Sequence, residues 1–201
     1  WDGSNWMPQT SGTVQSLRSV WVSDAGNVWA VGDGGAIRKW NGNSWSSQTS
    51  GTMSTLYSIW GSDVNNIWAV GQNGTIRKWN GSEWSAQTSG TTQNIYEVWG
   101  SDANNVWVVG DGGTIRKWNG SVWSAQTSGT TNALYSIWVS DANNAWVVGD
   151  GGTIRKWNGS NWSAQSSGTS LTLHTIWGSG VGNIWAVGDG GTMLYSDDQL
   201  I

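Results

Sequence analysis

The chain has 201 residues, a length that suits a single all-β domain. Its 20 tryptophans and 30 glycines stand beside one proline and no cysteine, which excludes a disulfide scaffold and a thiolate metal site. The net charge of -4, with nine lysines and arginines, argues against nucleic acid as a partner. No apolar run is long enough to cross a bilayer, so we expect no membrane insertion.

The chain opens on the segment WDGSNWMPQTSGT, residues 1–13, which predicts one short strand after a tight turn. It begins at Trp1 without an initiator methionine or a signal-like segment, so we expect a processed or trimmed start. The absence of cysteine does not by itself identify a compartment.

A unit of 39 residues repeats along the whole chain. All 20 tryptophans fall into four series of five, each advancing by this step, and the series begin at Trp1, Trp6, Trp21 and Trp29. Self-similarity at a period near ~40 residues is typical of propeller blades. We predict a single domain made of the units 1–39, 40–78, 79–117, 118–156 and 157–196.

Each unit predicts four short strands separated by turns. In the second unit, the first strand is apolar on both faces, as expected for a strand packed between neighbours. An SD turn, a glycine turn and a WNG turn then separate the remaining strands. The expected strands are residues 56–62, 67–70, 75–79 and 84–88.

The two ends of the chain carry complementary parts of one unit. The last unit keeps its third strand, at residues 191–196, while residues 1–13 carry only a fourth strand. Pairing of residues 6–9 with residues 192–196 would complete a fifth sheet and leave no long edge exposed. We therefore predict an all-β, five-bladed β-propeller of four-stranded antiparallel blades, closed by pairing of the N-terminal strand with the C-terminal blade. An open solenoid is the alternative, but it calls for polar capping units at its ends.

The tryptophans fall into two groups by their surroundings. Trp60, Trp68 and their counterparts lie in strongly apolar strands and are expected in the core. Trp79 and Trp84 flank the turn in WNGSEW, where the pair can staple the hairpin. The alternative is that one ring of each pair stays half exposed as a stacking platform for a sugar.

Most polar positions recur from unit to unit, which is typical of structural roles. The aspartate of the SD turn and an Arg-Lys pair are lost together in the last unit, so we expect these groups to pair within a blade. An Asx-turn role is expected for the aspartate series of the glycine turn. Calcium at the SD turns would have too few carboxylates for a cage, so no metal and no cofactor are expected. The two aspartate series are Asp24, Asp63, Asp102 and Asp141, then Asp33, Asp111, Asp150 and Asp189.

The composition offers few residues for catalysis, with no cysteine and one histidine. The single histidine, His174, stands at a variable position and is expected to be a tolerated surface or channel substitution. Glu83 and Glu97 are isolated glutamates, so a nucleophile-base pair or a pair of catalytic carboxylates is not evident. We predict that the chain is not an enzyme; the enzymatic alternative would rely on His174 and Glu97.

The unit WNGSxWSAQTSGTT, then LYSIWGSDANNVW, then VVGDGGTIRKW resembles bacterial propeller repeats of the photosystem II assembly-factor and BNR type across the whole chain. The Asp-box turn of BNR repeats has its aspartate one residue further from the tryptophan than Asn80 is from Trp84, which argues against a sialidase-like enzyme. The WNGSxW turn also resembles the WDGSxW turn of tectonin-type lectin repeats, although tectonin units are shorter. Five-bladed tachylectin-type lectins offer a similar ring by fold analogy.

The lectin resemblance implies a multivalent carbohydrate-binding propeller with up to five equivalent sites, secreted or at the cell surface, and monomeric. Glycans are then the expected partners, bound with useful avidity through repeated weak sites. The alternative is a non-catalytic structural or protein-interaction propeller, including an engineered or excised repeat fragment. The expected sugar-binding residues are Trp1, Asp2, Trp40, Asn41, Trp79, Asn80, Trp118, Asn119, Trp157 and Asn158.

Overall fold

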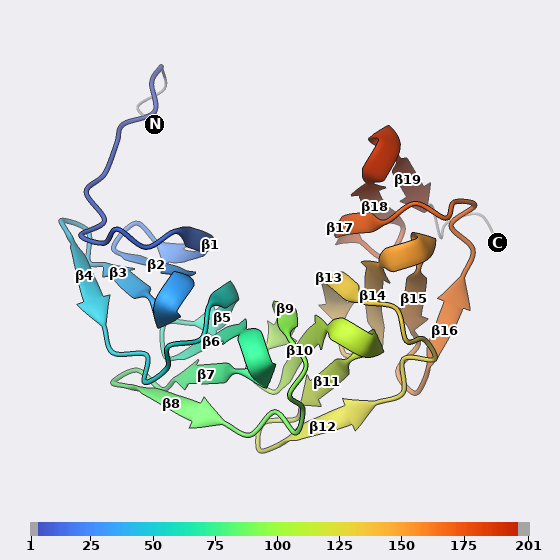
Figure 1. Ribbon diagram of the computed structural model, residues 1–201, viewed down its shortest axis with the longest axis horizontal. Helices are drawn as coiled ribbons and strands as arrows, with labels where there is room; N and C mark the ends of the chain where they lie inside the picture. Colours follow the sequence, from blue (N-terminus) through green and yellow to red (C-terminus); the bar gives the residue numbers. More distant parts are fainter. Residues whose placement is uncertain (1–3, 197–201) are drawn as a thin grey trace.

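The computed structural model describes residues 4–196, and this part of the chain contains 19 strands in five antiparallel sheets. The sheets follow one another along an arc, with one sheet edge of each facing the inside of the arc (Figure 1). The first sheet consists of β1 (Leu17–Asp24), β2 (Asn27–Gly32), β3 (Ile37–Trp40) and β4 (Trp45–Gln48), in that order. We call each sheet a blade.

The next three blades repeat this meander, and the fifth has three strands. Blade 2 is β5 (Leu56–Asp63), β6 (Asn66–Gly71), β7 (Ile76–Trp79) and β8 (Trp84–Gln87). Blade 3 is β9 (Ile95–Asp102), β10 (Asn105–Gly110), β11 (Ile115–Trp118) and β12 (Trp123–Gln126). Blade 4 is β13 (Leu134–Asp141), β14 (Asn144–Gly149), β15 (Ile154–Trp157) and β16 (Trp162–Gln165). Blade 5 is β17 (Leu173–Gly180), β18 (Asn183–Gly188) and β19 (Met193–Ser196).

A single 3-10 turn joins the second and third strands of each blade, and it depends on glycine. In η2 (Gln72–Gly74), Gly74 has φ +69, and a Cβ at this position would lie 1.9 Å from the carbonyl oxygen of Thr91. A side chain is therefore excluded both by the left-handed backbone and by the close approach of the neighbouring blade's connection. The predicted strands and turns of the second unit are confirmed to within a residue or two.

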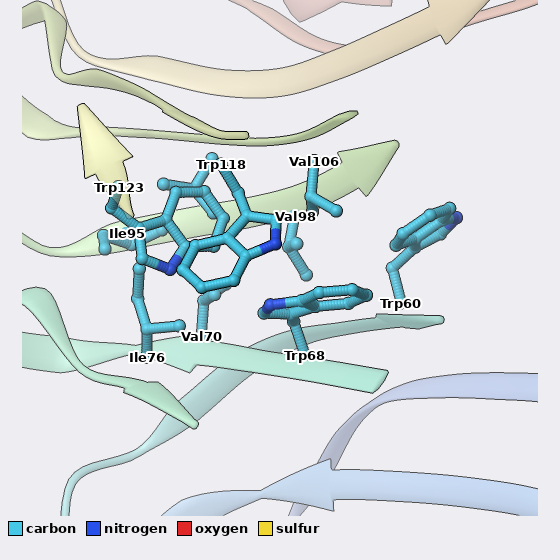
Figure 2. Close-up of a cluster of buried hydrophobic side chains, with 10 residues drawn as sticks. Trp60, Trp68, Val70, Ile76, Ile95, Val98, Val106, Trp118 and Trp123 are labelled. Atoms are coloured by element: carbon cyan, nitrogen blue, oxygen red, sulfur yellow. The ribbon is translucent and has the colours of Figure 1, made fainter. Parts of the chain in front are cut away.

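Indole rings fill the junctions between blades. Trp68 of β6 is fully buried and packs with Trp118 and Trp123 of blade 3 (Figure 2). The same contact recurs between blades 3 and 4, where the ring centroid of Trp107 lies 5.1 Å from that of Trp157. Such edge and tilted contacts of large aromatics add to the stabilisation that burial provides.

The core position predicted for the Trp60 and Trp68 series is confirmed in blades 2 to 4, where only Trp99 is partly buried, and fails in blade 5. Trp177 and Trp185 of blade 5 are 57% and 43% exposed. They occupy the same repeat positions as Trp60 and Trp68, but no further blade covers their face in the described part of the chain. Burial at these positions therefore depends on a neighbouring blade and not on the residue type.

The predicted ring closure is not made within the described residues. Blade 5 remains three-stranded, residues 5–10 form no strand, and Figure 1 shows them extending from blade 1 away from β19. The connection that follows them is held at blade 1, because the Arg38 guanidinium donates a hydrogen bond to the carbonyl of Gly12. Among residues 4–196, no helix is long and apolar enough to cross a membrane.

Candidate functional site

The first strand of each blade presents one large side chain near its beginning, beside the 3-10 turn of the same blade. Its counterpart lies 15 residues later, as the first residue of that turn. The hydrogen bonds below join these two positions in four of the five blades. We call the first set the aromatic row, Arg18, Tyr57, Tyr96, Tyr135 and His174, and the second set the acid row, Asp33, Gln72, Asp111, Asp150 and Asp189.

The aromatic row is continuous across all five blades. The ring centroids of Tyr57 and Tyr96 are 5.7 Å apart, and those of Tyr96 and Tyr135 are 5.3 Å apart. At the ends of the row, the Arg18 guanidinium lies 5.7 Å from the Tyr57 ring and His174 lies 6.2 Å from Tyr135. Stacked or tilted rings at such distances attract one another, so the row forms one connected surface.

The acid row anchors the aromatic row through side-chain hydrogen bonds. The Tyr96 hydroxyl donates to Asp111 at 2.7 Å, and the Tyr135 hydroxyl donates to Asp150 at 3.1 Å. His174 Nε2 lies 2.6 Å from an oxygen of Asp189.

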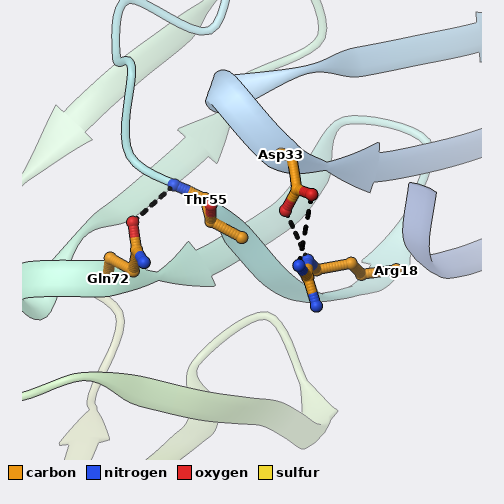
Figure 3. A network of polar contacts seen from close by, with 4 residues as sticks. All are labelled: Arg18, Asp33, Thr55 and Gln72. Atoms are coloured by element: carbon orange, nitrogen blue, oxygen red, sulfur yellow. Dashed lines mark hydrogen bonds and ion pairs between the residues drawn. The ribbon is translucent and has the colours of Figure 1, made fainter. Parts of the chain in front are cut away.

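Blades 1 and 2 use the same two positions differently, as Figure 3 shows. Arg18 Nε lies 2.5 Å from Asp33, and a second guanidinium nitrogen donates to the same carboxylate at 3.2 Å. Gln72 replaces the aspartate in blade 2, and its side-chain oxygen accepts the backbone N–H of Thr55. The Asx-turn role predicted for this aspartate series is therefore wrong for its side chains, which bind the aromatic row instead.

Burial and the acid row together shift the proton affinity of the phenols. Burial, aided by the hydrogen bond to Asp111, raises the pKa of Tyr96 to about 12. The pKa of Tyr135 is also raised, by burial first and by Asp150 second. The Arg18 guanidinium holds the pKa of the Asp33 carboxyl below its usual value. Tyr96 and Tyr135 therefore remain protonated hydrogen-bond donors at neutral pH.

A second repeated position, one residue further along each first strand, links neighbouring blades. The Ser58 hydroxyl accepts the backbone N–H of Val98 at 3.3 Å, and Ser136 accepts that of Ile176 at 3.2 Å. Glu97 replaces serine in blade 3 and accepts the N–H of Ile137 at 2.6 Å. Burial raises the pKa of Glu97 to about 7. Glu97 and His174, the residues of the enzymatic alternative, thus make separate contacts with different partners.

The predicted sugar-binding tryptophans lie mostly inside the fold. Trp79 is 6% exposed and its indole N–H donates to the carbonyl of Val64, while the Asn80 side chain accepts backbone N–H groups of its own turn. Trp118 and Trp157 are buried in the same way, and Trp40 is half buried. Asn41, Asn119 and Asn158 repeat the contacts of Asn80. Trp1 and Asp2 lie outside the described residues.

The SD-turn aspartates and the Arg-Lys pairs have separate principal contacts. Asp63 accepts hydrogen bonds from the Asn65 backbone and the Asn66 side chain, within its own turn. Arg77 donates to the carbonyl of Gly51 in the preceding connection, and Lys78 lies 5.0 Å from the Trp68 ring. An attraction from Asp63 opposes the lowering of the Lys78 pKa by burial, so the expected pairing survives only as a longer-range interaction. Residues 4–196 hold no cluster of three or more possible metal ligands.

The aromatic row is not among the sites predicted from the sequence. Its signal was a polar side chain at two positions 15 residues apart in every unit: tyrosine, histidine or arginine stands with aspartate in four blades. The two positions do not change together, because tyrosine also stands with Gln72 in blade 2. In the sequence His174 has the pattern of a variable position and the aspartates have that of turn residues, so neither position indicates the other as its partner. Only the antiparallel register of the first two strands, with Leu56 opposite Gly71 in blade 2, brings these positions together.

The sheets, their order and their indole-filled junctions define the chain as a tryptophan-rich β-propeller with five blades. No family model and no curated protein matches the sequence. Among solved structures, the chain is similar to YCF48 from Cyanidioschyzon merolae, with 16% identity, a TM-score of 0.76 and coverage of 99% of this chain and 75% of that one.

Two further structures give the same result. For YCF48 bound to D1 peptide, the values are 18% identity, TM-score 0.71 and coverage of 93% and 65%. For the WD40 β-propeller domain of Doa1, the identity is 16%, the TM-score is 0.79, and the match covers 93% of this chain and 67% of that one. At these identities the likeness shows the propeller fold, which confirms the expected architecture of repeated blades.

Proposed function

We propose that this chain is a non-catalytic interaction propeller that binds an extended peptide segment along the aromatic row. The observation that carries the proposal is the continuity of this row, in which partly exposed rings follow one another at 5.3–6.2 Å across blades 2 to 5. Alternate side chains of an extended peptide are spaced at roughly 6.5–7 Å, so successive side chains on one face would meet successive blades. The structure of YCF48 bound to D1 peptide gives a precedent for a peptide on this fold.

The charge of the site favours basic side chains in the peptide. Every blade except the second carries an aspartate in the acid row, and the net charge of the chain is -4. Aromatic faces beside carboxylates attract arginine and lysine through both cation-π and ionic contacts. Arg18 already neutralises Asp33, so we expect the basic residues to lie over blades 3 to 5.

Carbohydrate binding at the WNG turns, with a secreted or cell-surface location, remains the other prediction. It requires exposed indole faces, whereas Trp79, Trp118 and Trp157 are buried in the blade junctions. The contacts of the WNG residues therefore favour the interaction propeller over the lectin.

A peptide array and a glycan array on the same protein separate the two functions. We expect binding to Arg- and Lys-containing extended peptides, and a decrease in affinity of about tenfold when His174 and Tyr135 are both changed to alanine. Val122→Ala, an exposed turn residue on another part of the chain, is the matched control and should leave the affinity unchanged. Saturable glycan binding without peptide binding would contradict the proposal and support the lectin.

A further inference from the structure

The junction between blades 4 and 5 contains a pocket. Its volume is about 330 Å³, and its walls come from β14, β15, β18 and β19. Trp146, Ile154, Ile184, Met193, Leu194 and Tyr195 are among its lining residues. The pocket is therefore lined by polar groups, Lys156 and Ser167 among them, as well as by apolar side chains. It lies beside the edge of β19 that pairs with no strand in the described part of the chain.

The inner junctions show what occupies this place elsewhere. Trp107, the counterpart of Trp146 in blade 3, contacts Trp157 and Trp162 of the following blade, with centroids at 5.1 and 5.4 Å. Trp29 makes the same two contacts with Trp79 and Trp84. In the last unit the sequence places Ser196 and Ile201 at these two positions. Trp146 therefore faces a blade whose own sequence does not supply the indole pair.

The N-terminal segment carries the missing strand. Residues 5–9 read NWMPQ and correspond to residues 161–165, NWSAQ, which include the fourth strand of blade 4. Trp6 is 87% exposed, and residues 5–10 form no strand in this structure. Pro8 suits a fourth strand, because proline is tolerated on the outer edge of a sheet.

The outward faces of blade 5 and blade 1 are complementary, because among the described residues each lacks the neighbouring blade that covers the same face in the inner blades. Trp177 and Trp185 lie exposed on blade 5, whereas their counterparts in blade 4, Trp138 and Trp146, are covered by the next blade. On blade 1, Val20 is exposed, whereas its counterpart Ile59 is buried against the preceding blade. Blade 5 and blade 1 thus present the two halves of a blade junction.

We propose that two copies of this chain join head to tail, with residues 5–9 of one copy added as the fourth strand beside β19 of the other. Trp6 then enters the pocket at Trp146, and the exposed face of blade 5 is covered by blade 1 of the second copy. This arrangement replaces the monomer expected from the sequence.

A second copy fits better than closure of the chain on itself. Figure 1 shows an open gap between blade 1 and blade 5, so within one chain residues 5–9 lie away from the β19 edge that they would complete. The contact of Arg38 with Gly12 repeats that of Arg77 with Gly51 at an inner junction, so it is compatible with residues 5–9 pairing in a preceding blade. Because the two joining surfaces differ, the contact is heterologous and gives a ring or a chain of copies.

Cysteine cross-linking distinguishes the partner, because the chain has no cysteine of its own. Extending the register of blade 4, in which Lys156 pairs with Ser163, places Met7 opposite Tyr195. We expect a mixture of the M7C variant and the Y195C variant to form a disulfide-linked pair of chains on mild oxidation. A mixture of M53C and Y195C is the control, since Met53 is exposed on a connection outside the junction, and it should stay unlinked.

Two results would overturn the proposal. If the M7C/Y195C double variant forms only an intrachain disulfide while the mixture stays unlinked, the chain closes on itself. If neither links and light scattering gives the mass of one chain at every concentration, the ends do not associate. We expect Trp6→Ala to weaken the association by about tenfold or more, with Met53→Ala unchanged. The thermal midpoint of dilute Trp6→Ala should equal that of the parent, because Trp6 is exposed.

Discussion

The Glu97 carboxylate accepts the backbone N–H of Ile137 at 2.6 Å, across the junction between blades 3 and 4, where other blades use a hydroxyl. A carboxylate at this partly buried place is costly when it is charged, because burial favours the neutral acid. One substitution in a repeated contact therefore makes the stability of the propeller depend on pH.

The pH dependence has a definite sign. The pKa of Glu97 is about 7 in the folded chain and 4.5 in the absence of burial, so between these values the folded state binds more protons than the unfolded state. The free energy of unfolding should fall as the pH rises from about 4.5 to 7, by roughly 1 to 3 kcal/mol, and should then level off.

Urea unfolding at pH 5 and pH 8 measures this difference. Glu97→Ser, which restores the residue of blades 2 and 4, should reduce the difference and leave the inter-blade hydrogen bond in place. An unchanged pH dependence in this variant would show that another group is responsible.

The 3-10 turns allow a comparison of the same substitution with and without a neighbouring blade. Gly74→Ala places a Cβ 1.9 Å from Thr91, whereas Gly191, at the same repeat position with φ +74, has no neighbour within 4 Å. We expect Gly74→Ala to destabilise the chain by roughly 3 kcal/mol or more, and Gly191→Ala by about 1 to 2 kcal/mol from backbone strain alone. Thermal unfolding of dilute protein checks both, and equal losses would contradict the clash seen at Gly74.

The tryptophans of the second strand offer a second matched pair. Trp107 is fully buried between blades, whereas Trp185 is 43% exposed at the end of the arc. We expect Trp107→Ala to cost about 3 to 5 kcal/mol of unfolding free energy, because it leaves a cavity and removes contacts with Trp157 and Trp162. Trp185→Ala should cost much less in dilute solution. Chemical denaturation gives both values, and a similar loss for the two variants would show that blade 5 is already covered.

The Tyr96 and Tyr135 phenols should titrate late, because the pKa of each is raised. The pKa of Tyr96 is raised to about 12, by burial and by its hydrogen bond to Asp111. In Asp111→Asn, removal of the charge should lower this pKa, whereas Tyr96→Phe should remove the highest tyrosine step from a spectrophotometric titration. A Tyr96→Phe titration identical to that of the parent would place the perturbed phenol elsewhere.

The sequence by itself determined the internal structure of each blade. The spacing of Trp60, Trp68, Trp79 and Trp84, with turn residues between them, specifies four strands and their order, because strand alternation and turn chemistry act over a few residues. The tertiary structure decided what depends on neighbours. It buries Trp79 and exposes Trp177. The pairing of β9 with β10 brings the Tyr96 hydroxyl to Asp111, and the arc stays open beside β19 in the described part of the chain. Repeated residues are locally equivalent, but burial, pairing and curvature arise between blades, and blades at the end of an arc lack the neighbour that their inner copies have.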